Sequence, residues 1–383
     1  MKIAVVGGGG AMGRVTVRDA ARSDGVEEVW IVDLDDAAAE SVRAWVDSPK
    51  VSPRKGPLDE VLAGADAVVN AASHRLNLDC MQACLEVGAH YTDLGGLYYW
   101  ALRQFQLDEA FRAAGLSAAI SMGSAPGLTN MLAAAACETL DTVESVELVG
   151  ATIPSRDWSL DDPYAPPYAA GTLVDEFTEE APVFLDGRIE LRPAGSGAKV
   201  YRFPEGEVEC VYTIHSEPAT LPRSYAAKGI RTVEWRLGLP PADSVRLRSF
   251  MAAGLGSREP VTVAGMRVAP RDVLVAALQR QGHAVVDPGA VGRLRARVVG
   301  TARGERVAVD ADLLVTKPPE WDVDADTFAT GMPPSVAAQM LARGDCAGPG
   351  VAGPEAMLPT AVFFGELAAR GLHLELSEPA PTR

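Results

Sequence analysis

The sequence is short of the residues that mark several classes of protein. It has 383 residues with only five cysteines, too few and too scattered to predict a disulfide framework. No apolar run approaches the ~18 residues of a membrane span. The apolar stretch Ile3–Val6 ends in glycines, which argues against a signal peptide. We therefore expect a soluble, cytoplasmic protein without membrane contact.

Basic residues are scarce relative to acidic ones. There are 35 Lys and Arg against 51 Asp and Glu, a formal net charge of −16. Such a chain repels phosphate backbones, so we do not expect nucleic-acid binding. Cys80 and Cys84 lie one helical turn apart, but two small apolar side chains on a buried helix face explain them better than a metal site. Because no His, Cys or Asp cluster has metal-ligand spacing, we expect no metal.

Apolar residues are plentiful. They make up 48% of the chain, against 22% charged residues, which is typical of ordinary globular cores. At ~100–200 residues per domain, the length predicts two or three domains.

The first residues carry a phosphate-binding pattern. Lys2–Val6 predicts a buried strand, and a G-x-G-x-x-G motif and a helix-like stretch follow it. In such a motif the first glycine permits the tight turn, the second admits a pyrophosphate, and the third lets the helix pack on the strand. The helix N-terminus offers free N–H groups to the phosphates. The cofactor-binding residues expected here are Gly8, Gly10, Ala11, Met12 and Gly13.

A second strand, Glu28–Asp33, ends in an acid twenty residues after Gly13. An acid at this position accepts hydrogen bonds from the adenosine ribose and repels a 2′-phosphate. We therefore predict a Rossmann site that prefers NAD. NADP stays open as the alternative, because a basic side chain can accommodate the 2′-phosphate, and the candidates are Arg43, Arg54 and Lys55.

Strands and helices continue to alternate. Ala65–Ala72 is expected to be the third strand, His90–Leu94 and Leu116–Met122 later strands, and Tyr99–Gly115 a long helix. This alternation predicts an α/β fold with a doubly wound parallel sheet, which binds ligands at its carboxyl edge. Further cofactor-binding residues expected at that edge are Asn70, Ala71, Ala72 and Gly95.

The second half changes character. Short β-like runs divided by Gly and Pro predict an α+β substrate domain with its own sheet. Helix-like stretches then follow, and we expect them to pack on the first domain. The expected domains are residues 1–140 (dinucleotide-binding), 141–324 (substrate) and 325–383 (C-terminal helical segment).

Several motifs, in order along nearly the whole chain, resemble the saccharopine dehydrogenase-like family, most closely its lysine epsilon-dehydrogenases. They are GGGAMG (8–13), VVNAA (68–72), HYTDLGG (90–96), APGLTN (125–130), IPSR (153–156), TLPRSY (220–225), APRDVL (269–274) and VAAQML (336–341).

The resemblance implies an oxidoreductase acting at a C–N bond of an amino-acid substrate. The leading hypothesis is oxidative deamination of the side-chain amine of L-lysine, or of a related ω-amino acid, by hydride transfer to NAD. The alternative is a reductase of saccharopine or carboxynorspermidine type, which condenses an amine with an aldehyde or oxo acid. By analogy with two-domain dehydrogenases, we expect a homodimer or homotetramer.

Three residues are candidates for proton transfer. Asp93 ends a predicted strand beside the nicotinamide site, although capping the Gly95–Gly96 turn explains it equally well. His215 and Glu217 make a plausible acid–base pair, with a solvated strand end as the alternative. Since the lysine dehydrogenases carry small or hydroxyl residues about here, this pair departs from their pattern and favours a second substrate.

Arginine is the residue expected to bind a substrate carboxylate. Arg156 and Arg223 match arginines of the family motifs, with surface salt bridges as their alternative role. Tyr168 belongs to a YAPPY segment that either lines the substrate pocket or forms a rigid surface loop.

Overall fold

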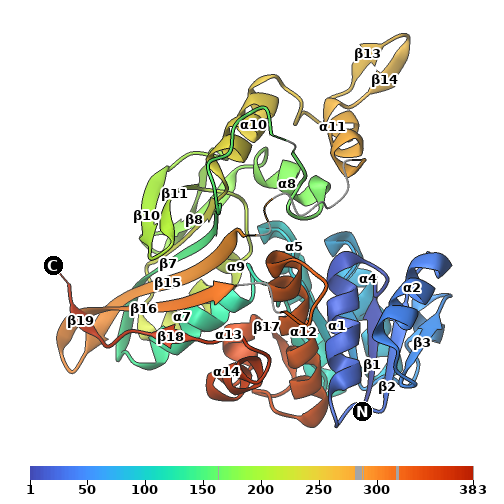
Figure 1. Cartoon of the computed structure of the whole chain (residues 1–383). Helices are drawn as coiled ribbons and strands as arrows, with labels where there is room; N and C mark the ends of the chain where they lie inside the picture. Colours follow the sequence, from blue (N-terminus) through green and yellow to red (C-terminus); the bar gives the residue numbers. More distant parts are fainter. Residues whose placement is uncertain (163, 281–286, 288, 316–318, 383) are drawn as a thin grey trace.

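The computed structural model describes residues 1–162, 164–280, 287, 289–315 and 319–382. The chain forms two large sheets with helices on and between them (Figure 1).

The first sheet has seven parallel strands in the order β17-β6-β5-β4-β1-β2-β3. Its strands are β1 (Lys2–Val6), β2 (Glu28–Val32), β3 (Val51–Arg54), β4 (Ala67–Asn70), β5 (His90–Asp93), β6 (Ser117–Ala119) and β17 (Gly350–Ala352). The intervening helices are α1 (Ala11–Arg22), α2 (Asp36–Val46), α3 (Leu58–Val61), α4 (Asn77–Val87), α5 (Tyr98–Gln104) and α6 (Asp108–Ala114). The predicted doubly wound parallel sheet is confirmed.

Two strands of this sheet differ from the prediction. β3 precedes the segment expected to be the third strand; it is an edge strand containing Pro53, with little apolar signal. β17 comes from the far end of the chain and pairs with β6, a long-range contact that no local pattern reveals. The long helix expected over Tyr99–Gly115 is broken into α5, a 3₁₀ turn and α6.

The second sheet is mixed and is built around long strands. β7 (Thr142–Ile153) pairs in parallel with β12 (Thr232–Gly238) and antiparallel with β15 (Val291–Ala302). The remaining strands are β8 (Ala181–Leu185), β9 (Arg188–Arg192), β10 (Lys199–Phe203), β11 (Gly206–Val211), β16 (Glu305–Val315), β18 (Glu375–Leu376) and β19 (Ala380–Pro381). The α+β character predicted for this half is confirmed.

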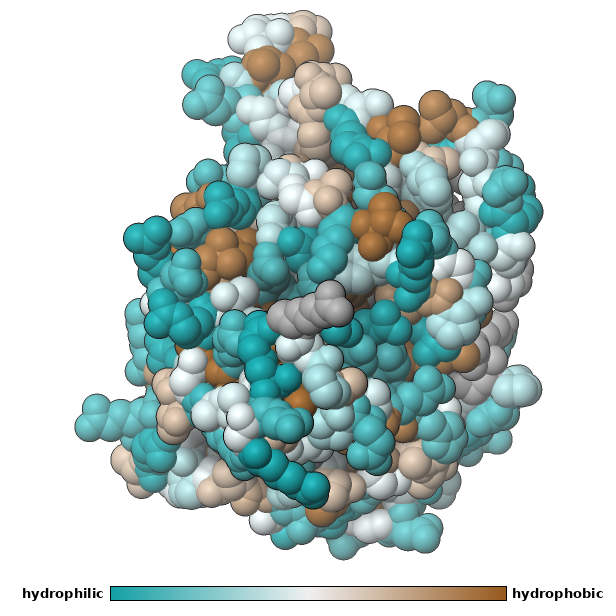
Figure 2. Space-filling model, turned by 90° about the vertical axis from the view of Figure 1, so that its left-hand side faces the viewer, coloured by the Kyte–Doolittle hydropathy of each residue, from teal (hydrophilic) through white to brown (hydrophobic). Residues whose placement is uncertain are grey.

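Helices α8 (Ala170–Glu176), α10 (Pro241–Ala252) and α11 (Pro270–Gln279) lie at one end of the second sheet, and α9 (Glu217–Ser224) packs against β12. The hairpin of β13 (Val261–Val263) and β14 (Met266–Val268) projects at the top of Figure 1. Figure 2 shows a mostly hydrophilic face on which hydrophobic residues form small separate groups. No helix in the described ranges is long and apolar enough to cross a membrane.

A shared core joins the two sheets. Every residue of α7 (Leu128–Glu138) from Leu128 to Cys137 is buried. Most of its apolar side chains belong to one cluster with residues of β7, β15, β16 and α12 (Ala325–Arg343). Because α7 follows directly after the first sheet's carboxyl edge, this core fixes that edge relative to the second sheet.

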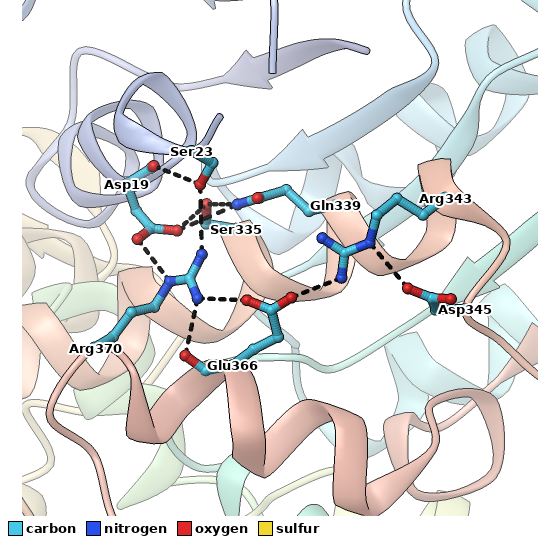
Figure 3. Close-up of polar contacts among 8 residues, drawn as sticks. All are labelled: Asp19, Ser23, Ser335, Gln339, Arg343, Asp345, Glu366 and Arg370. Atoms are coloured by element: carbon cyan, nitrogen blue, oxygen red, sulfur yellow. Dashed lines mark hydrogen bonds and ion pairs between the residues drawn. The ribbon is translucent and has the colours of Figure 1, made fainter. Parts of the chain in front are cut away.

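The C-terminal segment returns to the first sheet. α12 packs closely on α1: the Thr16 hydroxyl donates to the Gly331 carbonyl at 2.7 Å, and a Cβ on Gly331 would lie 2.4 Å from the Met12 carbonyl oxygen. Figure 3 shows Asp19 of α1 accepting from Ser335 and Gln339 of α12 and from Arg370. Arg370 follows α14 (Thr360–Ala368), which α13 (Pro354–Met357) precedes.

Candidate active site

The glycine-rich turn lies between β1 and α1. A Cβ on Gly13 would lie 2.2 Å from the Gly7 carbonyl oxygen, so only glycine lets the helix approach the strand this closely. The turn itself uses Gly7, whose φ is +74°, and not Gly8 as the motif predicted. Gly10 caps α1 without a side-chain hydrogen bond, which leaves the first-turn N–H groups at Ala11 and Met12 available to an anion. This cradle fits a pyrophosphate.

Asp33 follows β2 beside this turn. Its Oδ2 accepts from the Gly9 N–H at 2.9 Å and its Oδ1 from the Asp35 N–H at 3.0 Å. The carboxylate is therefore held at the edge of the cradle.

All three basic side chains expected as alternatives for a 2′-phosphate are engaged elsewhere. Arg43 donates to Glu40 at 2.8 Å, and Lys55 pairs with Asp36 at 2.8 Å. The guanidinium of Arg54 lies 3.2 Å from the centre of the Trp30 ring and donates to the Val61 carbonyl.

A cavity of about 640 Å³ begins at this cradle and extends to the face of the second sheet. Of the predicted cofactor residues, Ala11, Met12, Ala71, Ala72 and Gly95 line it. The other predicted cofactor residues lie behind the residues that line the cavity. They are Gly8, Gly10, Gly13, Asp33 and Asn70. Asn70, for instance, is buried, accepts from the Ala72 N–H at 3.1 Å and donates to Asn77 at 2.7 Å.

The segment between β11 and α9 contributes His215 to the cavity wall. His215 lies just before α9, and its ring stacks on Trp235 of β12 with centroids 4.2 Å apart. Its Nδ1 faces Glu217 Oε2 at 2.9 Å, and its Nε2 faces Glu176 Oε1 at 3.7 Å. The structure thus brings the predicted pair of His215 and Glu217 together, and adds a second glutamate.

The two glutamates set the charge of this histidine. Burial disfavours the imidazolium, but the charges and hydrogen bonds of Glu217 and Glu176 outweigh it and raise the pKa of His215 to about 9. At neutral pH, His215 is therefore a buried cation that holds a proton on each ring nitrogen.

The carboxylates around His215 are themselves positioned. The Thr129 hydroxyl of α7 donates to Glu217 at 2.9 Å, and the Tyr168 hydroxyl donates to Glu176. Burial, followed by the charge of Glu176, raises the pKa of Tyr168 well above its usual value, so it remains a phenol and a donor. Tyr168 lines the cavity.

Sequence reasoning missed several residues of this wall, among them Glu176, Trp235, Asp326 and the buried pair of Asp175 with Arg271 (2.6 Å). Adjacent acids inside the apolar run LVDEF (173–177) were the one available signal for Asp175 and Glu176.

Asp93 caps turns at the sheet edge, which is the alternative to proton transfer that the sequence left open. Its side chain is fully buried, and the residue is not among those that line the cavity. The carboxylate accepts from the Gly95 and Ser121 N–H groups, both at 2.8 Å, and from Gln104 at 2.5 Å. Burial raises its pKa, against the opposing effect of these donors. The geometry makes Asp93 an anchor of two turns at the sheet edge, directly behind Leu94 and Gly95 of the cavity wall.

The two arginines expected to bind a carboxylate lie elsewhere. Arg156 is exposed, pairs with Asp162 at 3.0 Å and stacks on Trp158. Arg223 is exposed and lies over the Phe105 ring at 4.4 Å. Neither lines the cavity: Arg223 lies on α9 and Arg156 lies just after the end of β7, and both side chains are exposed.

Two other charged side chains, those of Arg75 and Asp326, line the cavity. Neither forms an ion pair with another described residue. Arg75 is exposed at the sheet edge. Asp326 lies in the first turn of α12, where burial and then the charge of Asp324 raise its pKa to about 6. Among all the residues that the structure describes, no three His, Cys, Asp or Glu side chains are grouped so that they could hold a metal ion.

A parallel sheet with a glycine-rich dinucleotide cradle, joined through one cavity to a mixed sheet beside which His215 lies, is the arrangement expected of an NAD(P)-dependent oxidoreductase. The family models specify it further: residues 3–119 match the saccharopine dehydrogenase NADP binding domain, and residues 123–372 match the saccharopine dehydrogenase C-terminal domain. The chain belongs to the saccharopine dehydrogenase family, and it is an enzyme that acts on carbon–nitrogen groups. The resemblance predicted from the motifs is confirmed at this level.

The individual relatives described here share only a modest part of their sequence with this chain. The chain is 22% identical to carboxyaminopropylagmatine dehydrogenase of Synechocystis, over 99% of both proteins. It is 26% identical to carboxynorspermidine synthase of Vibrio cholerae, over 82% of this chain and 78% of that protein. Among solved structures, apo saccharopine dehydrogenase (L-Glu forming) from Saccharomyces cerevisiae has a TM-score of 0.73 at 15% identity and covers 98% of this chain and 99% of that one.

Proposed function

We propose that the enzyme condenses a primary amine with an aldehyde or oxo acid and reduces the resulting imine with NADH. The observation that carries this proposal is the His215 imidazolium, held by Glu217 and Glu176 in the cavity wall. Its pKa of about 9 makes it a proton donor near neutral pH, as the condensation requires. The two relatives described above are named for carboxylated amines, which supports the same class of product.

The chain's own residues account for the proton steps. The amine adds to the carbonyl carbon to give a carbinolamine. His215 Nε2–H then donates its proton to the hydroxyl group as the C–O bond breaks, which releases water and leaves an iminium ion. Glu176 and Glu217 stabilise that cation by their charge, and His215 regains a proton from solvent. A dihydronicotinamide cofactor, held at the glycine-rich turn beside Ala11 and Met12, would supply the hydride for reduction of the iminium carbon.

The carboxylate of an oxo acid needs a cation at the cavity. Arg75 lines the cavity from the sheet edge and has a free guanidinium as far as the described residues go. The other two arginines that line the cavity are already paired, Arg271 with Asp175 and Arg293 with Glu205. We therefore assign carboxylate binding to Arg75.

Oxidative deamination of lysine is the competing proposal, supported by the motifs shared with lysine dehydrogenases. That direction needs a base that removes the ammonium proton. His215 is neutral only above a pH of about 9, so this proposal predicts activity at alkaline pH alone.

A two-substrate assay separates the proposals. NADH oxidation at neutral pH is followed with amines, with aldehydes or oxo acids, and with their mixtures. We expect consumption only when both substrates are present, with a secondary amine as product by mass spectrometry. Reduction of NAD by lysine alone, at a rate that matches or exceeds every mixture, overturns the condensation.

A further inference from the structure

The two carboxylates beside His215 do not by themselves fix the plane of its ring. Glu217 Oε2 lies 2.9 Å from Nδ1 and holds that atom, whereas Glu176 Oε1 lies 3.7 Å from Nε2, beyond the length of an ordinary hydrogen bond. A single hydrogen bond fixes one atom of a ring and allows the ring to swing about it. The proton on Nε2, which the proposed condensation uses, therefore needs a further contact to hold its direction.

Trp235 of β12 supplies a flat contact over the whole imidazole ring. The two ring centroids lie 4.2 Å apart, and the ring planes are inclined by only 18°. Both side chains are buried, so little water is available to screen one from the other. The face of an indole carries negative charge density and attracts a cation, and this attraction is stronger where both partners are shielded from water.

Two neighbouring residues hold the indole in place. Its Nε1–H donates to the Thr213 hydroxyl at 2.9 Å. On β7, a Cβ at Gly150 would lie 2.7 Å from Cη2 of the indole, so the absence of a side chain at Gly150 makes room for the ring. Trp235, Gly150 and His215 all line the main cavity. The stack of Trp235 on His215 is therefore a built part of the cavity wall.

We propose that Trp235 is a positioning residue for His215: its indole face holds the imidazolium in the protonated form and keeps Nε2 toward Glu176. This inference rests on the proposed role of His215 as the acid of the condensation. The charged groups that face His215 are Glu217 of α9 and Glu176 of α8, and β12 adds the uncharged indole. Unlike a third carboxylate, an indole cannot accept the proton, so it stabilises the cation without competing for the proton that the substrate receives.

The first test uses the fluorescence of the protein and needs no substrate. A protonated imidazole quenches the emission of an indole that it contacts, and a neutral imidazole quenches it much less. The emission should therefore rise as the pH is raised through about 9, the pKa of His215. This rise should be absent in His215→Gln, which keeps Trp235, and in Trp235→Phe, which keeps His215. A rise of the same size in either variant, or no rise in the wild type, overturns the inference.

Trp30→Phe is the matched control for the fluorescence. Trp30 and Trp235 are both 2% exposed and both lie on strands, so the two substitutions remove similar packing. The alkaline rise should persist in Trp30→Phe, and its loss there would contradict the assignment to Trp235. Trp100 lies edge-on to His74 at 5.5 Å, but burial and then the charge of Arg75 lower the pKa of His74 below 6.5. Its titration therefore falls at acid pH and is separate from the alkaline rise.

The second test asks whether the stack acts on the reaction. It is the pH profile of kcat for the most active mixture of the two-substrate assay, in which the alkaline limb reports loss of the acid. Trp235→Leu removes the aromatic face, so this limb should move to lower pH by about one pH unit, which corresponds to ~1.4 kcal/mol. Trp235→Phe keeps a weaker face and should lie between the wild type and Trp235→Leu. A lower kcat without movement of the limb indicates a purely structural role and overturns the inference.

The two tests together separate failure of the stack from failure of the reaction. If no mixture consumes NADH, yet the alkaline rise requires both His215 and Trp235, the condensation fails and the stack stands. If a mixture consumes NADH and the limb lies at the same pH in Trp235→Leu, the condensation stands and the inference fails. Should Trp235→Leu fail to fold, Thr213→Val takes its place, because it removes the hydrogen bond that orients the indole. Thr213→Val should move the limb in the same direction by a smaller amount, and an unmoved limb overturns the inference.

Discussion

The cofactor end and the substrate end of the cavity are built in different ways. At the cofactor end, backbone groups from one stretch of chain form the site. Gly13 and Gly7 fix its shape, because a Cβ on Gly13 would lie only 2.2 Å from the Gly7 carbonyl oxygen. At the substrate end, side chains from α7, α8, β12 and the segment before α9 meet around His215. The first end follows from local sequence, whereas the second depends on how distant segments pack.

This difference separates what the family shares from what is specific to the chain. A backbone cradle recognises a pyrophosphate, which every nicotinamide cofactor has. A constellation of side chains recognises a substrate, and single substitutions can change it. The comparison therefore predicts that substitutions at the substrate end change rate and specificity, whereas those at the cofactor end change affinity for the dinucleotide.

The largest effect is expected at His215. His215→Gln keeps the polar side chain but removes the acid, so kcat for the condensation should fall by about 10²–10⁴-fold. The dissociation constant for NADH, measured by fluorescence titration, should change by less than about threefold, because His215 lies outside the cradle. Loss of NADH binding in this variant would break the proposed division between the two ends.

The pH dependence gives an independent check on the same residue. Because its pKa is raised from 6.5 to about 9, the stability that His215 contributes is fully present below pH ~6.5 and is lost as the pH rises through ~9. Urea unfolding midpoints at pH 7 and pH 10 should therefore differ more for the wild type than for His215→Gln.

The second largest effect concerns cofactor choice. Asp33→Ser removes the charge that repels a 2′-phosphate, so the ratio of NADPH to NADH affinity should rise by about ten- to a hundredfold. Wild-type enzyme should prefer NADH, because Arg43, Arg54 and Lys55 are all engaged elsewhere. Equal affinity of the wild type for both cofactors would contradict this assignment.

These expectations show how far the sequence alone can lead. The G-x-G-x-x-G turn and Asp33 were predictable because their chemistry depends on local spacing. His215 and Glu217 were predictable as a pair because they are two residues apart. Glu176 and Asp326 were not, since only the packing of α8 and α12 brings them to the cavity. The sequence did not predict β17 for the same reason: its three residues come from the far end of the chain and join the first sheet only through pairing with β6.

A smaller effect is expected at Asp93, where the two alternatives of the sequence predict different results. Asp93→Asn keeps the shape but loses a charged acceptor for the Gly95 and Ser121 N–H groups. We expect a loss of about 1–3 kcal/mol in the free energy of unfolding, with kcat reduced by less than about tenfold at a temperature where the variant is folded. A proton-transfer role would instead lower kcat by ~10²-fold or more without loss of stability.

The smallest effects are expected at Arg156 and Arg223, although both match arginines of the family motifs. Each is exposed, one beside Asp162 and Trp158 and the other over Phe105, and exposed contacts of this kind contribute about 0–1 kcal/mol. Alanine at either position should leave KM for the oxo acid within about twofold. Arg75→Ala is the positive control, and it should raise that KM by about tenfold or more, since a charged hydrogen bond is lost. If Arg223→Ala has the larger effect, the carboxylate binds outside the cavity and motif matching locates it better than geometry does.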